Sequence, residues 1–240
     1  MLVADASFTT PKHLLSALDS PYIRYSIQLS LLSCTMTTIL SLWVSIPIGY
    51  LLARGDFRGK HLVDAILDIP IVLPPLVIGL SLLILFQTGL GRAVERVIPV
   101  TYEIPSIILA QFMVACAFAV RTLRATFESI NPRAEQVALV LGCSRAQAFW
   151  LVVLPEAKRG VLTAGTLAWA RSLGEFGPIL VFSGATRMKT EVLPTTVFLE
   201  LSVGNIEAAV AVSLLMVAAA VAVLVIVRVF GSEDTLRGVV

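Results

Sequence analysis

Charged residues are scarce in this sequence, and so are the residue types that build most enzyme sites. Only 14% of the 240 residues are charged and 57% are hydrophobic, whereas a soluble domain carries roughly 25% charged residues. The cysteines and histidines are too few and too scattered for a metal site, and we interpret the cysteines as small apolar fillers. They are Cys34, Cys116, Cys143, His13 and His61. The net charge of +2 is too small to indicate nucleic-acid binding.

Nucleotide-binding and catalytic motifs are missing as well. Gly59-Lys60 is followed by His61, and Arg54 occupies the position where a phosphate-binding loop needs its first glycine. We recognise neither a Ser/His/Asp arrangement nor a catalytic pair of carboxylates. We therefore expect that the chain is not itself an enzyme and that it holds no cofactor of its own.

Long uncharged runs are abundant instead. Residues 25–53, 69–91, 104–120 and 208–227 contain no charge, and a fifth apolar stretch, 160–186, is interrupted by two charged residues. A run of about 18 or more apolar residues is typical of a membrane span. A large soluble helical core would show polar residues every few positions, which these runs do not. The sequence therefore predicts an all-α integral membrane protein with five transmembrane helices.

Basic residues in the loops predict the orientation of these spans. Nine lie in the first and third loops, against four in the second and fourth. The nine are Arg54, Arg58, Lys60, Arg121, Arg124, Arg133, Arg145, Lys158 and Arg159, and the four are Arg92, Arg96, Arg187 and Lys189. We expect a multi-pass protein of the cell (inner) membrane with the N-terminus outside and the C-terminus in the cytoplasm. Its predicted parts are an extracytoplasmic or interfacial segment (1–24), a transmembrane domain (25–230) and a cytoplasmic tail (231–240).

The second span contains Pro70, Pro74 and Pro75. Proline removes a helical hydrogen-bond donor and breaks or kinks a helix. Broken backbone at membrane depth is tolerated where protein or a water-filled cavity covers it. Pro74 and Pro75 are therefore predicted to lie at a pathway or at a subunit contact, although a local kink without a role remains the alternative.

The third loop, residues 122–158, is too polar to span and is patterned as two short helices. Asn131 before Pro132 is a favoured helix start, and Gly142 is a typical helix stop. Ser144 and Gln147 have capping-box spacing for a second helix, which stays apolar until Pro155. A DNA-binding helix-turn-helix is disfavoured, because the element lies between two spans and lacks a basic recognition face. A docking element for a cytoplasmic partner fits better, and we call it the helix–glycine–helix loop (residues 131–155).

This loop resembles a motif of ATP-binding-cassette importer permeases, in which a glutamate-alanine-alanine sequence is followed by a glycine and an isoleucine-x-leucine-proline ending. The corresponding residues are Glu135, Gln136, Ala138, Gly142, Leu154 and Pro155. The departures are Gln136 for the usual glutamate, Val137 for an alanine and Val152 for the isoleucine. The resemblance implies that these residues couple the chain to an ATPase.

Two further stretches resemble the molybdate- and sulfate-type permeases. One is Leu73-Pro74-Pro75, and the other is residues 170–177, which are most similar to the molybdate branch. Pro178 departs from the small residue expected there. The resemblance covers roughly residues 25–230. It implies a type I permease-like fold and uptake of an oxyanion, molybdate first, with tungstate or sulfate as alternatives.

The resemblance also implies the partners. They are a cytoplasmic ATP-binding-cassette ATPase dimer that binds the ATP, an extracytoplasmic substrate-binding protein, and a second copy of the chain, all in membrane lipid and without nucleic acid. The same machinery with another cargo, such as another anion, a metal ion or a polyamine, stays open. A secondary transporter or channel would not need the helix–glycine–helix loop.

The two charged residues in the apolar stretch 160–186, which is the fourth span in chain order, are Arg171 and Glu175, four positions apart. Charged residues at the membrane centre cost roughly 2.5–3.5 kcal/mol on insertion scales and usually face the protein interior. We predict a gate or path element in which Arg171 offers positive potential to an anion. The alternative is an ion pair that only packs the bundle.

Overall fold

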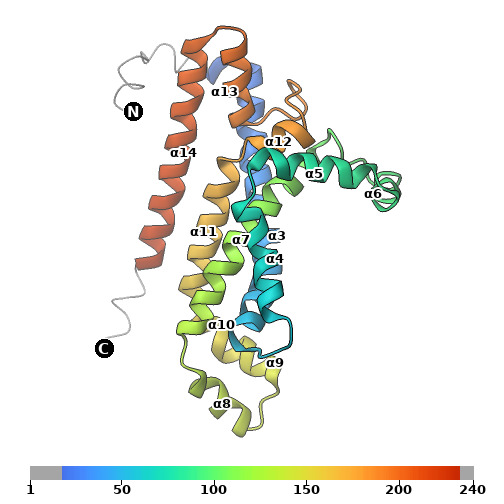
Figure 1. Ribbon diagram of the computed structural model, residues 1–240. Helices are drawn as coiled ribbons and strands as arrows, with labels where there is room; N and C mark the ends of the chain where they lie inside the picture. The colour runs from blue at the N-terminus through green and yellow to red at the C-terminus, as the bar shows by residue number, and fades with distance from the viewer. Residues whose placement is uncertain (1–17, 233–240) are drawn as a thin grey trace.

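The computed structural model describes residues 18–232, and side chains up to residue 225. The described chain is helical, and its elements are α3 (Pro21–Arg54), α4 (Lys60–Val72), α5 (Pro75–Gln87), α6 (Gly89–Glu95), α7 (Ile104–Ser129), α8 (Pro132–Val140), α9 (Arg145–Ala148), the π-helix η1 (Phe149–Val153), α10 (Leu154–Glu156), α11 (Lys158–Leu173), α12 (Gly177–Phe182), α13 (Leu193–Ser202) and α14 (Ile206–Ser232). Figure 1 shows a long bundle with α13 at one end and α8 and α9 at the other.

The centre of the bundle is built by α3, α7 and α11, which pack against one another. The buried face of α3 is a seam of small residues spaced three or four apart, namely Ser26, Ser30, Ser33, Thr37, Ser41, Ser45 and Gly49. Small residues let helix backbones approach closely in a membrane, where apolar side chains gain little from leaving lipid. A Cβ at Gly49 would lie 3.0 Å from Leu123 Cβ on α7. The backbones of the two helices are therefore in close contact.

The expected count of five spans is not confirmed. Among the described residues, three helices are long and apolar enough to cross a membrane, and α4 with α5 could form a fourth, broken span. The three are Pro21–Arg54, Ile104–Ser129 and Ile206–Val225. The predicted fourth-span stretch, 160–186, is divided, because α11 ends at Leu173 and α12 begins at Gly177. Glycine at position 174 forms the C-cap of α11 and ends this helix after only 16 residues.

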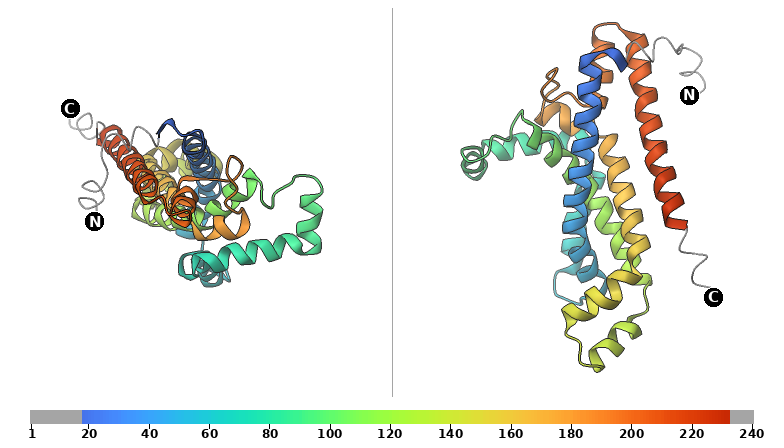
Figure 2. Two further views of the ribbon diagram at one scale, coloured as in Figure 1. Left: turned by 90° about the horizontal axis from the view of Figure 1, so that it is seen from above. Right: turned by 180° about the vertical axis from the view of Figure 1, so that it is seen from behind.

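The proline-rich segment of the second span breaks the helix as predicted. Pro70 is tolerated inside α4, whereas Leu73 and Pro74 leave the helical conformation. The axes of α4 and α5 differ in direction by 111°. Figures 1 and 2 show α5 and α6 as an arm that leaves the bundle sideways.

Ion pairs fasten α4 to the bundle. None of its residues is fully buried. Arg121 of α7 binds Asp68 with Nε 2.6 Å from Oδ1, and Arg124 binds Asp64 at 2.5 Å. Since little apolar surface of α4 is covered, these pairs hold it in register with α7.

The predicted domain boundaries fall close to helix ends. Helix α3 begins at Pro21, before residue 25, and α14 continues to Ser232. The expected extracytoplasmic segment and cytoplasmic tail lie largely in residues 1–17 and 233–240, outside the described residues. Their positions relative to a membrane stay predictions.

Candidate functional site

The helix–glycine–helix loop protrudes at one end of the bundle (Figure 1). Its first helix, α8, starts as the sequence predicts. The Asn131 side chain accepts a hydrogen bond from the Arg133 amide at 3.0 Å, and Pro132 occupies the first turn. Asparagine satisfies an amide that has no partner within the helix, and proline has no such amide to lose.

Gly142 ends α8 in a left-handed conformation, with φ at +94°. The Cys143 amide donates to the Ala138 carbonyl and the Gly142 amide to the Leu139 carbonyl, both at 3.1 Å. These two bonds form a Schellman motif, which glycine favours because it has no Cβ to clash. Ala138 is buried, and its carbonyl accepts one of the two bonds that end the helix.

The second helix begins one residue after Cys143 with the predicted capping box. Ser144 Oγ accepts from the Gln147 amide at 3.3 Å, and Gln147 Oε1 accepts from the Ser144 amide at 2.8 Å. The Schellman motif and the capping box leave only a short stretch of chain between α8 and α9. The angle between them is therefore fixed by local backbone bonds.

Pro155 does not end the second helix, contrary to the sequence prediction. The chain passes through a π-helical turn, in which the Leu154 amide donates to the Phe149 carbonyl, and continues to Glu156. Proline displaces the carbonyl four residues before it, and a wider turn accommodates that displacement. Pro155 is exposed and Leu154 is partly buried.

The outer face of α8 is apolar and open. Val140 is 87% exposed and Leu141 79%. With Arg133, Gln136 and Val137 they line a shallow pocket of about 420 Å³. We call these five residues the outer α8 face. Apolar side chains ringed by polar ones at a molecule's end are typical of a protein contact surface.

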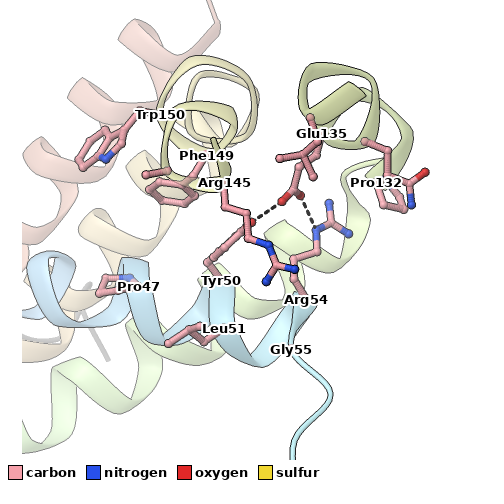
Figure 3. A pocket seen from close by; sticks show the side chains of 13 residues that line it. Pro47, Tyr50, Leu51, Arg54, Gly55, Pro132, Glu135, Arg145, Phe149 and Trp150 are labelled. Atoms are coloured by element: carbon pink, nitrogen blue, oxygen red, sulfur yellow. Dashed lines mark hydrogen bonds and ion pairs between the residues drawn. The ribbon is translucent and has the colours of Figure 1, made fainter. Parts of the chain in front are cut away.

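The inner side of the loop encloses a larger cavity of about 760 Å³ between α3, α8 and η1 (Figure 3). Gln136 lies between this cavity and the outer α8 face and lines both. Glu135 points inward: its carboxylate accepts a hydrogen bond from Tyr50 and lies 3.5 Å from Arg54 Nε. The basic neighbour of Glu135 is therefore a residue of its own chain.

The second group of predicted residues lies near the base of the arm. Arg171 Nη1 is 2.8 Å from Glu175 Oε2, and their side chains are 32% and 1% exposed. The Arg171 guanidinium also lies over the Phe118 ring, 5.8 Å from its centroid. The two charges do not share a helix as predicted, because α11 ends at Leu173 and Glu175 follows its C-cap.

The break at Pro74-Pro75 and the break after α11 meet in space. A Cβ at Gly177 would lie 3.0 Å from Pro75 Cβ, and α12 packs against α5. Two parts of the sequence that were singled out separately as pathway candidates are therefore neighbours. The arrangement places an ion pair with a buried carboxylate near the two breaks in the helices.

Sequence reasoning missed three features of this geometry. Arg54 was interpreted only through the loop charge, and Tyr50, one turn before it at the end of α3, was not interpreted at all. Glu191 is fully buried. The surroundings of all three side chains depend on tertiary packing.

Among the described residues, no group of histidine, cysteine and acidic side chains could hold a metal ion. The fold and the site together define a helical membrane protein with a sharply bent helix pair, α4 and α5, and a projecting helix–glycine–helix loop. The chain belongs to the family of binding-protein-dependent transport system inner membrane components, whose model matches residues 45–232. This membership confirms the resemblance to permeases of ATP-binding-cassette importers.

Curated relatives are similar over most of the chain. The molybdate/tungstate transport system permease protein WtpB of Pyrococcus abyssi is 36% identical over 70% of this chain and 64% of its own length. A probable molybdenum transporter permease of Haloferax volcanii is 33% identical over 85% and 74% of the two chains. The sulfate transport system permease protein CysT of Escherichia coli is 32% identical over 86% and 76%. The alignment thus spans less than two thirds of the Pyrococcus protein.

Solved structures share the fold. A bacterial alginate transporter, in complex with an alginate pentasaccharide-bound periplasmic protein, matches with a TM-score of 0.76 and 16% identity over 95% of this chain and 85% of that chain. A second structure of an alginate importer matches with a TM-score of 0.66 and 22% identity over 97% and 87%. At these identities the similarity describes the architecture alone.

Proposed function

We propose that the chain is the membrane-spanning permease subunit of an ATP-driven importer and forms the path for an oxyanion. Molybdate is the first candidate, and tungstate and sulfate are the alternatives. The helix–glycine–helix loop carries the coupling part of this proposal, because it projects from the bundle with an apolar face uncovered. The cargo rests on the resemblance around residues 170–177 and on the printed names of the relatives.

The proposed assembly contains two permease chains, two cytoplasmic ATPase subunits and an extracytoplasmic binding protein. ATP would be bound and hydrolysed by the ATPases, since this chain has no phosphate-binding loop. The outer α8 face would dock on the ATPase, and the binding protein would deliver the anion at the opposite end. The binding protein supplies most of the selectivity, and the permease supplies alternating access.

Arg171 supplies positive potential in this path without becoming a tight binding site. Its guanidinium is one third exposed while its partner Glu175 is buried. The carboxylate of Glu175 lowers the net positive charge that an anion meets at Arg171. The anion is therefore attracted to this position without being held tightly. Residues Pro74 and Pro75 set the bend that brings α5 beside this pair.

Uptake measurements test the cargo. Deleting the gene should abolish high-affinity uptake of molybdate, or of tungstate or sulfate, when that anion is scarce, and plasmid-borne wild-type chain should restore it. Unchanged uptake of all three anions, together with loss of another cargo, would contradict the oxyanion proposal and leave the importer proposal standing. The absence of any uptake defect and of any ATPase that co-purifies with the chain would contradict both.

A further inference from the structure

Two residues of α3 hold the carboxylate of Glu135. Tyr50 donates its hydroxyl hydrogen to Glu135 Oε1, and Arg54 Nε lies 3.5 Å from Oε2. The side chains of Arg54 and Glu135 are only 17% and 14% exposed. Figure 3 shows the three side chains converging from α3 and α8 on the inner side of the loop. Both oxygens of Glu135 are therefore engaged within its own chain.

Arg54 also holds the point where α7 ends and α8 begins. Its Nη2 donates to the Ile130 carbonyl at 2.8 Å, and Ile130 is the C-cap of α7. One guanidinium thus contacts the backbone before α8 and the side chain of Glu135 within it. Arginine suits such a task because its planar group offers several donors in a fixed geometry.

The ring of Tyr50 extends the contact to the second half of the loop. Its centroid lies 4.7 Å from that of Phe149 in η1 and 5.7 Å from that of Phe127 in α7. Aromatic rings at such distances pack favourably beyond the area they bury. Tyr50 therefore touches α7, α8 and η1 at once.

We propose that Tyr50 and Arg54 clamp the helix–glycine–helix loop to α3 through Glu135, so that a displacement of the loop is delivered to α3. The inference rests on the proposed function, in which the loop docks on an ATPase. It assigns Glu135 to transmission rather than to docking, because its carboxylate faces α3 while the outer α8 face is formed by other residues. These three residues act as positioning residues of the transport cycle.

The clamp is connected by packing contacts to the interface between α3 and α7. Gly49, the residue before Tyr50, packs on α7 so closely that a Cβ there would lie 3.1 Å from the Arg124 backbone nitrogen. This contact contains no empty space, so a shift of α3 at Tyr50 would also displace α7. The loop, the end of α3 and the adjoining turn of α7 therefore form one mechanical unit.

The test uses the complete transporter, co-expressed with its ATP-binding-cassette subunit and binding protein and reconstituted in proteoliposomes with molybdate. The variants are Tyr50→Phe, which keeps the ring and removes the hydroxyl, and Glu135→Gln, which keeps the shape and removes the charge. Glu128→Gln is the matched control, because Glu128 is an exposed carboxylate that pairs with Arg124 outside the clamp. Val140→Asp on the outer α8 face tests docking separately.

We expect the amount of ATPase bound to both clamp variants to stay within about twofold of wild type. The number of anions imported per ATP hydrolysed should fall tenfold or more. The reversed pair, Arg54→Glu with Glu135→Arg, should recover part of that ratio over either single change. The control should transport normally, and Val140→Asp should lose the ATPase itself.

Normal import per ATP in both clamp variants would overturn the inference. Loss of ATPase association in Tyr50→Phe and Glu135→Gln, with unchanged thermal stability, would overturn it as well, since Glu135 would then be a docking residue. Retention of the ATPase by Val140→Asp would contradict the proposed docking face and not the clamp. Wild-type chain that never retains an ATPase would contradict the proposed function itself.

Discussion

Gly79 of α5 meets Pro178 of α12 so closely that a Cβ at position 79 would lie 2.8 Å from the Pro178 Cα atom and carbonyl oxygen. The backbone of α12 at position 178 therefore occupies the space that a side chain at position 79 would need. Backbone atoms cannot move aside as the end of a side chain can. We expect Gly79→Ala to separate α5 from α12 at a cost of about 1–3 kcal/mol.

A lower thermal unfolding midpoint in detergent would report this cost. Gly89→Ala is the matched control, because a Cβ at Gly89 on α6 would meet nothing within 4 Å. Equal midpoints for the two variants would show that the arm is not held by the contact at Pro178.

Gly142→Val should insert in the membrane at near-normal levels and bind its ATPase poorly, or bind it without substrate-linked stimulation. The left-handed conformation at Gly142 costs a residue with a Cβ roughly 1–2 kcal/mol, and a β-branched residue is a genuine outlier there. No neighbour would clash, so the effect is one of backbone strain at the turn.

Gly204→Val is the control for that experiment. Gly204 also has a positive φ, +78°, and open space around it, but it lies in the turn after α13 at the other end of the molecule (Figure 1). Co-purification and ATPase stimulation should fall only for Gly142→Val. Equal losses in both variants would indicate general damage rather than a coupling defect.

Arg171 and Glu175 should respond unequally to neutralisation. Arg171→Gln leaves a carboxylate that is 1% exposed without its partner, and breaking a buried pair in this way costs roughly 3–5 kcal/mol. Glu175→Gln leaves a guanidinium that already reaches solvent. Thermal stability in detergent should therefore fall more for Arg171→Gln, whereas anion uptake should fall in both.

The reversed pair, Arg171→Glu with Glu175→Arg, separates a path element from a packing element. It places a negative charge in the last turn of α11, where the helix dipole disfavours it, so we expect lower stability as well. Assembled protein that transports poorly would support the role of Arg171 in the path. Full transport would show that the pair only packs the bundle.

Labelling of Cys143 tests the orientation. Cys34 and Cys116 are buried, and Cys143 is partly exposed. A membrane-impermeant thiol reagent should label Cys143 in inside-out vesicles and spare it in intact cells. Labelling from outside intact cells would reverse the predicted topology and remove the basis for cytoplasmic coupling.

Glu191 should make stability depend on pH. Burial raises the pKa of its carboxyl, and the positive charge of Arg187 opposes this only in part. Because the folded-state pKa lies above the unfolded value, the protonated form stabilises the fold fully at pH below about 4.5, and this contribution is lost as pH rises through the raised folded value. Glu191→Gln should therefore raise the unfolding midpoint at pH 7 and change it little near pH 4.

Glu156→Gln, at an exposed carboxylate, should show no such pH-dependent gain. A Glu191→Gln variant that is equally stable to wild type at both pH values would indicate that the carboxylate is hydrated or paired in solution.

The helix–glycine–helix loop could be predicted from the sequence because its signals are local. Asn131, Gly142 and the Ser144–Gln147 pair each act on backbone groups within a few residues, and each was found where predicted. The spacing of Arg171 and Glu175 offered their ion pair as an alternative to a path element, and the pair is present. The position of Glu175 after the end of a helix was not predicted. Gly174 ends α11 within an apolar stretch whose average hydropathy indicates one continuous span.

Contacts between distant segments could not be predicted from the sequence. Nothing in residues 50–54 specifies that their side chains meet Glu135, since that contact depends on the crossing of α3 with α7. The proline run predicted a break, but it did not predict the 111° bend or the packing of α5 against α12. The expected count of five spans is not confirmed, because the region 160–186 is divided between α11 and α12.

The bend between α4 and α5 also has a consequence for biogenesis. Helix α5 is complete when Gln87 has been synthesised, whereas its covering helix α12 begins only at Gly177. At roughly 5–20 residues per second, the interval is on the order of 5–20 s. The contact of α5 with α12 can therefore form only after most of the chain has been synthesised.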